Sequence, residues 1–307
     1  METAEALMGM LFNAALVIMI VATMFSAGLS TTLSALGGVF KNVWLVVLVL
    51  IAAFIIRPLV GWGTAALLAL ATPAFIAMLL LAACPGAPFG AKLVMTARGD
   101  LITGATLQVL MAAIGSVTFP ITANWLISAA GLGGDFSLPV WDLVKTVAVL
   151  QLIPFVVGIG VRHWSPETAA RWNPPVTQTS TYAFVIVLAL ALLGSWQTLV
   201  ALIGSRTILA GIIFAVLMIV LGYFVAVGGK KTRSSVALLE PISNAGPVFA
   251  AVAIAFNNDP EILGAATGII LVQIIVGTIV ASYFAKGQPE PEDTLANDQT
   301  SEAQPAT

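Results

Sequence analysis

An acid, a hydroxyl and an amide stand close together in the segment Glu240-Pro-Ile-Ser243-Asn244, inside an apolar stretch of the chain. Their oxygen atoms are ligands that a cation or a polar solute would use. Lys92 and Gln108 also lie in apolar surroundings. A lysine near the centre of a lone membrane-spanning helix costs about 2.5 to 3.5 kcal/mol, so Lys92 is expected to have a partner or a function.

Catalytic chemistry is poorly supported by the same residues. An enzyme would need a nucleophile beside a base, or several carboxylates at one depth. Only Cys84 and Glu240 lie well inside the apolar segments, and no His, Asp or second Glu stands beside them. His163 adjoins Arg162 at the end of an apolar run, where an interfacial place is favoured over a metal site. We therefore expect no enzyme and no bound cofactor.

Composition defines the environment of these side chains. Hydrophobic residues make up 59% of the 307 residues, charged residues 8%, and the mean hydropathy is +1.04. A soluble domain is about a quarter charged, so a water-soluble fold is excluded. The net charge of -2 and the short basic run Lys230-Lys231-Thr-Arg233 give no reason to expect a nucleic-acid partner. The expected partners are the lipid bilayer and a small solute.

Apolar runs divide the chain into about nine segments. Because a spanning helix needs about 20 apolar residues, residues 1–286 predict an all-α polytopic membrane domain. Residues 287–307 are rich in Pro, Glu, Asp, Gln and Thr and predict a disordered cytoplasmic tail. The segments begin near Met8, Val43, Pro73, Leu101, Trp141, Gln178, Thr207, Ser234 and Pro260.

The basic residues predict the orientation of these segments. With the N-terminus outside a cell inner membrane and the C-terminus in the cytoplasm, only Arg206 falls in an external loop, as the positive-inside rule requires. No Lys or Arg precedes Lys41, which argues against a cleaved signal peptide. The basic residues assigned to the cytoplasmic side are Lys41, Arg98, Arg162, Arg171, Lys230, Lys231, Arg233 and Lys286.

Two segments are interrupted by paired prolines. The third contains Cys84-Pro85-Gly86-Ala87-Pro88-Phe89-Gly90, and the eighth contains Glu240-Pro241-Ile242-Ser243-Asn244-Ala245-Gly246-Pro247. Proline removes a backbone donor and glycine relaxes the chain, so both helices should break within the membrane. Such backbone survives only where protein or a water-filled cavity satisfies it. Paired breaks in the two halves of a chain point to a transporter's binding site. The predicted crossover residues are Pro85, Gly86, Pro88, Gly90, Pro241, Gly246 and Pro247.

Three motifs accompany the breaks: Met24-Phe25-Ser26-Ala27-Gly28-Leu29, then Cys84-Pro85-Gly86 followed by Ala97-Arg98-Gly99-Asp100, and Pro154 through Gly158 to Arg162. With them the chain resembles the bile acid:sodium symporter family in its nine-helix form. The resemblance implies an inverted repeat with two crossing broken helices. It also implies a panel of about residues 8–32 and 141–200, and a core of about residues 43–128 and 207–285. The implied function is secondary active transport of an organic anion, a carboxylate or a bile-acid-like solute, by alternating access with Na⁺ symport.

The sodium ligands that the resemblance implies are largely missing. The family's Ser-Asn pair falls on Gly90 and Ala91, and its two hydroxyl positions fall on Gly104 and Gln108. Of these four residues only Gln108 offers a side-chain oxygen. The eighth segment is also one residue shorter than the family pattern, which leaves the second sodium site unassigned.

Lys92 and Glu240 lie at equal depth, about 10 Å from the cytoplasmic boundary at about 1.5 Å per residue. We hypothesise that the Lys92 ammonium replaces the first sodium ion and is held by Glu240, Ser243, Asn244 or Gln108. Transport would then be sodium-independent, or coupled to H⁺ because burial disfavours a charged lysine. The alternative is that Lys92 snorkels to the headgroups.

Other polar positions support weaker expectations. Arg57 lies deep in the second segment, where it would contact an anion or snorkel. The remaining functional alternatives are a membrane-embedded sensor or a channel that uses the same cavity. Six further side chains could line the cleft, although small polar residues more often form interhelical hydrogen bonds: Asn13, Thr23, Ser26, Ser30, Gln151 and Gln197.

Overall fold

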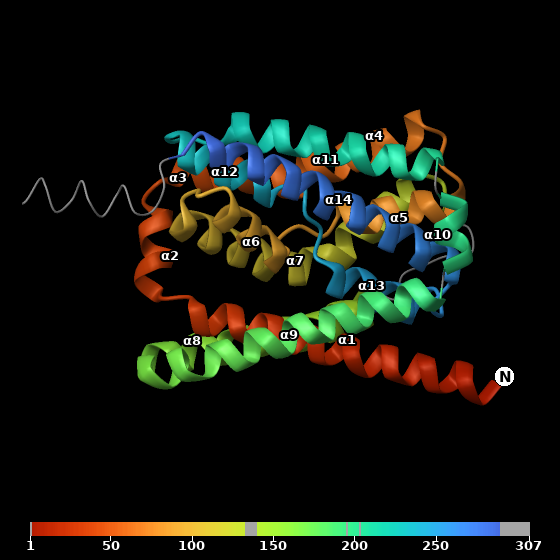
Figure 1. Ribbon diagram of the computed structural model, residues 1–307, viewed down its shortest axis with the longest axis horizontal. Helices are drawn as coiled ribbons and strands as arrows, with labels where there is room; N and C mark the ends of the chain where they lie inside the picture. The colour runs from red at the N-terminus through yellow and green to blue at the C-terminus, as the bar shows by residue number, and fades with distance from the viewer. Residues whose placement is uncertain (1, 133–139, 195, 203, 289–307) are drawn as a thin grey trace, which may run out of the picture.

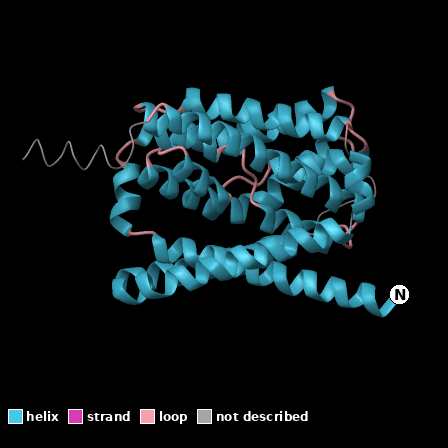
Figure 2. Cartoon of the chain, in the orientation of Figure 1, coloured by secondary structure: helices cyan, strands magenta, loops and turns pink. Residues whose placement is uncertain are grey.

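The computed structural model in Figure 1 describes residues 2–132, 140–194, 196–202 and 204–288. Within these ranges the chain forms helices joined by short loops and contains no strand (Figure 2). The predicted disordered tail lies almost wholly outside the described residues.

The helices follow one another with few residues between them. The first part of the chain forms α1 (Glu2–Ser30), α2 (Leu33–Phe40), α3 (Val43–Ile51), the π-helical η1 (Ala52–Ile56), α4 (Arg57–Leu67), α5 (Thr72–Ala82), α6 (Pro88–Thr96) and α7 (Leu101–Ala129). The second part forms α8 (Val140–Trp164), α9 (Pro166–Gly194), α10 (Trp196–Leu202), α11 (Arg206–Val225), α12 (Lys230–Leu239), α13 (Ala245–Ala255) and α14 (Pro260–Lys286).

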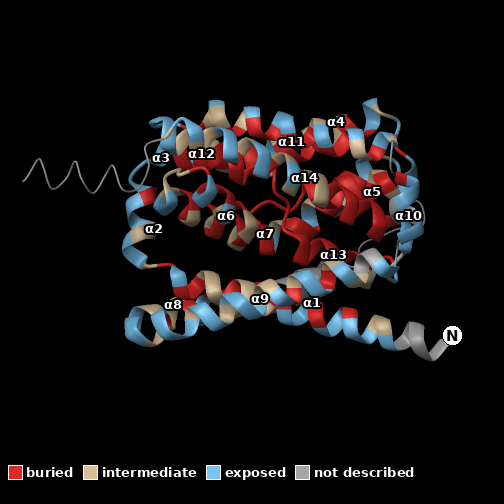
Figure 3. Ribbon diagram, in the orientation of Figure 1, coloured by how far each residue is buried: buried red, intermediate tan, exposed pale blue. Residues whose placement is uncertain are grey.

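The predicted class, an all-α polytopic membrane protein, is confirmed. Five helical stretches among the described residues are long and apolar enough to cross a membrane: Leu7–Ser30, Val43–Leu67, Leu101–Ala129, Arg206–Val225 and Pro260–Lys286. Large apolar side chains such as Trp44, Phe224 and Ile279 stay exposed on their outer faces, while the interior is closely packed (Figure 3). An exposed apolar surface of this extent is suited to lipid.

Among the predicted segment starts, that of the sixth segment differs most from the structure. The sixth segment was predicted to begin near Gln178, but α9 begins at Pro166 and contains Pro174 and Pro175. The turn between α8 and α9 consists of Ser165. The prediction was wrong because polar residues and prolines in the first turns of a long helix resemble a connecting loop.

The helices α1, α8 and α9 form one layer along the lower edge of Figure 1. The layer depends on close backbone contact between α1 and α8. A Cβ atom at Gly28 would clash with the Phe155 carbonyl oxygen and lie 2.9 Å from the Gly158 Cα. A Cβ at Gly158 would lie 2.6 Å from the Phe25 carbonyl oxygen. Small residues of this kind let membrane helices approach each other closely.

Both predicted interruptions are present. A non-helical segment, residues 83–87, separates α5 from α6, and another, residues 240–244, separates α12 from α13. The two segments touch, since the Asn244 N–H donates to the Cys84 carbonyl at 2.9 Å. Gly86 has a φ of +86°, and any Cβ there would clash with the Ala112 backbone. The two broken helices therefore cross at their breaks, and glycine is required at Gly86.

We predict that Gly28→Ala lowers the free energy of unfolding by about 1–3 kcal/mol, because the added methyl group forces α1 and α8 apart. The matched control is Gly9→Ala on the same helix, where a Cβ meets nothing within 4 Å. Thermal unfolding of both variants in detergent measures the difference. Equal melting temperatures for the two variants would contradict the backbone contact.

Candidate functional site

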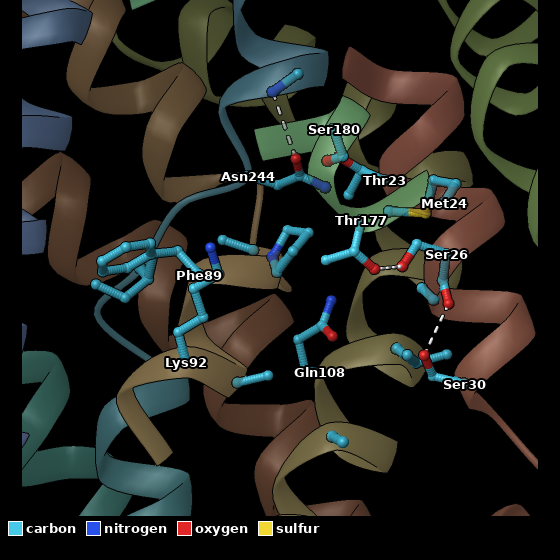
Figure 4. A pocket seen from close by; sticks show the side chains of 18 of the residues that line it. Thr23, Met24, Ser26, Ser30, Phe89, Lys92, Gln108, Thr177, Ser180 and Asn244 are labelled. Carbon is cyan, nitrogen blue, oxygen red and sulfur yellow. Dashed lines mark hydrogen bonds between the residues drawn. The ribbon is translucent and has the colours of Figure 1, made fainter. Parts of the chain in front are cut away.

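A pocket of about 680 Å³ lies between the layer of α1, α8 and α9 and the side chains of α2, α6, α7, α13 and α14. Its volume is within the range of small-molecule sites. Apolar side chains make up much of the wall, among them Met19, Met24, Phe89, Phe184 and Ile270. Figure 4 shows the polar side chains that project into the pocket from several helices.

Hydroxyl and amide groups form a polar row along α1 and α9. The Ser26 hydroxyl donates to Asn173 Oδ1 at 2.8 Å, and Asn173 Nδ2 donates to Ser30 Oγ at 3.0 Å. Ser26 and Thr177 also share a hydrogen bond of 2.6 Å, drawn in Figure 4. Thr23 on α1 likewise shares a hydrogen bond with Ser180 on α9. The predicted residues Thr23, Ser26 and Ser30 thus line the pocket and join the two helices.

Lys92 supplies the positive charge of the pocket. Its side chain is exposed and extends from α6 beside Phe89 into the space that Gln108 and Asn244 also face (Figure 4). Lys92 is the only charged side chain among the described residues that line the pocket. A single cation in a wall without carboxylates favours an anionic solute.

The start of each second half-helix also borders the pocket. The α6 helix begins at Pro88, and α13 begins at Ala245 with Asn244 as its N-cap. The Asn244 side chain accepts from the Gly246 N–H at 3.4 Å. Helix N-termini carry partial positive charge, so both ends reinforce the attraction that Lys92 exerts on an anion.

The predicted pairing of Lys92 with Glu240 is not present. Glu240 exposes no surface, and neither of its carboxylate oxygens accepts a hydrogen bond from any described residue. It does not line the pocket, whereas Lys92 does. The prediction rested on sequence spacing alone, and the structure places Lys92 in the pocket wall and Glu240 in the buried break after α12.

Side chains from α7 and α14 hold the two breaks in place. Gln108 Nε2 donates to the Gly86 carbonyl at 3.0 Å. Gln273 Oε1 accepts from the Ser243 N–H at 3.0 Å, and Gln273 Nε2 donates to Ser243 Oγ at 3.1 Å. Gln108 was expected as a cation ligand, but its amide nitrogen supports the first break. Gln273 was missed because no local pattern marks it.

Arg57 lies at the crossover with no exposed surface. Its Nε donates to the Glu240 carbonyl at 3.0 Å, and its Nη2 donates to Ser243 Oγ at 2.7 Å. Its Nη1 donates to the carbonyls of Leu81 and Ala82 at 2.9 and 2.8 Å. Arg57 therefore neither snorkels nor contacts a solute in the pocket, so both expectations for this residue were wrong.

The remaining candidates divide between the pocket and other surfaces. Gln151 lines the pocket and accepts from the Ser116 hydroxyl at 2.8 Å. Asn13 and Gln197 are exposed on α1 and α10, away from the pocket. His163 lines a separate hollow of about 310 Å³ beside Arg162.

The residues that stand at the family's first sodium site do not form an oxygen shell. Gly90 and Ala91 lie on α6 and Gly104 lies on α7, and none has a side-chain oxygen. Within the described part of the chain, no three His, Cys, Asp or Glu side chains are grouped to hold a metal ion.

Sequence comparison finds relatives of this chain among known transporters. Sodium/bile acid cotransporter 5 of Rattus norvegicus is 25% identical over 156 residues, which cover 50% of this chain and 35% of the relative. The uncharacterized sodium-dependent transporter YocS of Bacillus subtilis (strain 168) is 24% identical over 178 residues, 57% of this chain and 53% of the relative. The aligned region thus spans only a third to about half of these relatives. The profile of the Sodium Bile acid symporter family matches residues 17–206, and the chain belongs to this family.

Proposed function

We propose that the protein is a secondary active transporter that moves a small organic anion through the membrane by alternating access. Membership of a transporter family supports this class of function. The observation that carries the choice of an anion is the charge of the pocket, where Lys92 is the only charged side chain among the described lining residues. The N-termini of α6 and α13 add to its positive potential.

The wall of the pocket favours a solute with two unlike parts. A carboxylate would meet Lys92 and the N-termini, while an apolar body would lie against side chains such as Met24, Phe89 and Phe184. Hydroxyl groups of α1 and α9 could then donate a hydrogen bond to a further oxygen on the solute, or accept one from a solute hydroxyl. A carboxylate with an apolar frame, including a bile-acid-like one, is the solute class that we propose.

Alternating access needs two bodies that move relative to each other. We propose that α1, α8 and α9 form the panel and that the helices around the crossover form the core. The pocket lies between them, so a displacement of the core would open it to either side of the membrane. The crossing half-helices would carry the solute site with the core.

We further propose an external N-terminus and a cytoplasmic C-terminus in a cell inner membrane. The α6–α7 turn lies against the start of α12, since the Asp100 N–H donates to the Lys231 carbonyl at 3.4 Å. Arg98, Lys230 and Lys231 are thereby brought to one end of the molecule. Thr32 and Met95 belong to the pocket lining near this end, so with the proposed orientation the pocket would open toward the cytoplasm.

We predict that Lys92→Met lowers the affinity for an organic anion about 10- to 100-fold, because a charge-assisted hydrogen bond of about 1.5–3 kcal/mol is lost. Lys92→Arg should keep most of the affinity. The measurement is uptake of radiolabelled carboxylates and a bile acid into proteoliposomes over a range of concentrations. Lys41→Met, at an exposed position outside the pocket, is the control. Unchanged uptake by Lys92→Met would contradict the proposed role.

The same proteoliposomes can test the coupling ion. Because Gly90, Ala91 and Gly104 supply no side-chain oxygen, we predict that a Na⁺ gradient drives no more uptake than an equal K⁺ gradient. Uptake that follows an imposed pH gradient would add H⁺ coupling, with Lys92 as the first group to test. Uptake that rises steeply with a Na⁺ gradient alone would overturn the prediction.

A further inference from the structure

The negative ends of two half-helices meet at the crossover. The carbonyls of Leu81 and Ala82 belong to the last turn of α5, and Glu240 follows the last residue of α12. The final carbonyls of a helix have no partner within that helix and carry partial negative charge. The Glu240 side chain is buried beside these carbonyls and adds two carboxyl oxygens that accept no hydrogen bond in the described part of the chain. The partial negative charge at the crossover therefore favours a cation there.

Arg57 supplies that cation from a neighbouring helix. The π-helical turn Ala52–Ile56 comes directly before it, and Pro58 follows it as the second residue of α4. A π-helical turn displaces the residues after it relative to a regular helix and is frequent at functional sites. The guanidinium also lies 5.3 Å from the centre of the Phe214 ring on α11, which favours a positive charge.

The hydrogen bonds of Arg57 have the pattern of a cation site. Four oxygen atoms surround the guanidinium at 2.7–3.0 Å: three backbone carbonyls and the Ser243 hydroxyl. In secondary transporters, unwound carbonyls and the C-terminal ends of half-helices are the groups that coordinate Na⁺. Here every one of these four oxygens already accepts a hydrogen bond from the same side chain.

We propose that the Arg57 guanidinium is a resident cation that takes the place of a mobile coupling ion at the crossover. While Arg57 is in place, Na⁺ has neither the room nor the ligands to bind there. Without the side chain, the same oxygens and the Glu240 carboxylate would form a site for a monovalent cation. Arg57 thus has the role that sequence reasoning gave to Lys92, which leaves Lys92 available to the solute. This inference deepens the proposed function and rests on it for its meaning in transport.

The test is thermal unfolding in detergent, with NaCl and KCl compared at equal ionic strength. The wild-type protein should melt at the same temperature in both salts. Arg57→Ala should be less stable in KCl, and Na⁺ should raise its melting temperature by about 3 °C at a concentration ten times the dissociation constant. The double variant Arg57→Ala/Glu240→Gln should lose this response to Na⁺. Arg206→Ala, at an exposed position at the start of α11, is the control and should behave like the wild type.

Two results would overturn the inference. One is a wild-type protein that melts at a higher temperature in NaCl than in KCl, because Na⁺ would then bind although Arg57 is in place. This measurement does not depend on whether any variant folds. The other is an Arg57→Ala variant destabilised equally in both salts, because Arg57 would then only fasten the crossover. If Arg57→Ala does not fold, Arg57→Gln offers a shorter neutral side chain for the same comparison. Because these readouts need no transport, an absence of anion uptake by the wild type would reject the proposed function and leave this inference intact.

Discussion

The structure depends on one constraint, which is that backbone groups freed by two helix breaks must find partners without help from lipid. An unsatisfied backbone group in hydrocarbon costs several kcal/mol. The breaks satisfy each other where Asn244 donates to Cys84, and side chains satisfy the rest. Gln108 on α7 and Gln273 on α14 reach the breaks from either side. The positions of these helices relative to the crossover follow from this requirement.

The interruptions themselves could be predicted from the sequence because their cause is local. Proline lacks a donor and glycine lacks a Cβ wherever they stand, so Pro85, Gly86 and Pro241 mark the breaks without any knowledge of the neighbours. The apolar runs likewise predicted the class of fold. Local polarity was less informative at α9, where Pro174 and Pro175 lie inside a helix rather than before one.

The partners of the breaks could not be predicted in the same way. Sequence spacing measures the depth of a residue along its helix but not the direction of its side chain, and therefore Lys92 and Glu240 were expected to pair. The contact that forms instead joins Arg57 to the carbonyl of Glu240, 183 residues away in sequence. The sequence around a lone arginine in an apolar run does not indicate which helix ends will surround it after folding.

The polar row on α1 and α9 has a consequence for the range of solutes. Ser26, Ser30 and Asn173 bond to one another across the helix interface, so these three side chains already have partners when the pocket is empty. A buried site with unpaired polar groups discriminates strongly against ligands that lack the matching atom. Polar side chains that already hydrogen-bond to one another impose no such penalty. If the protein carries an organic anion as proposed, this row of side chains would therefore tolerate solutes with varied frames.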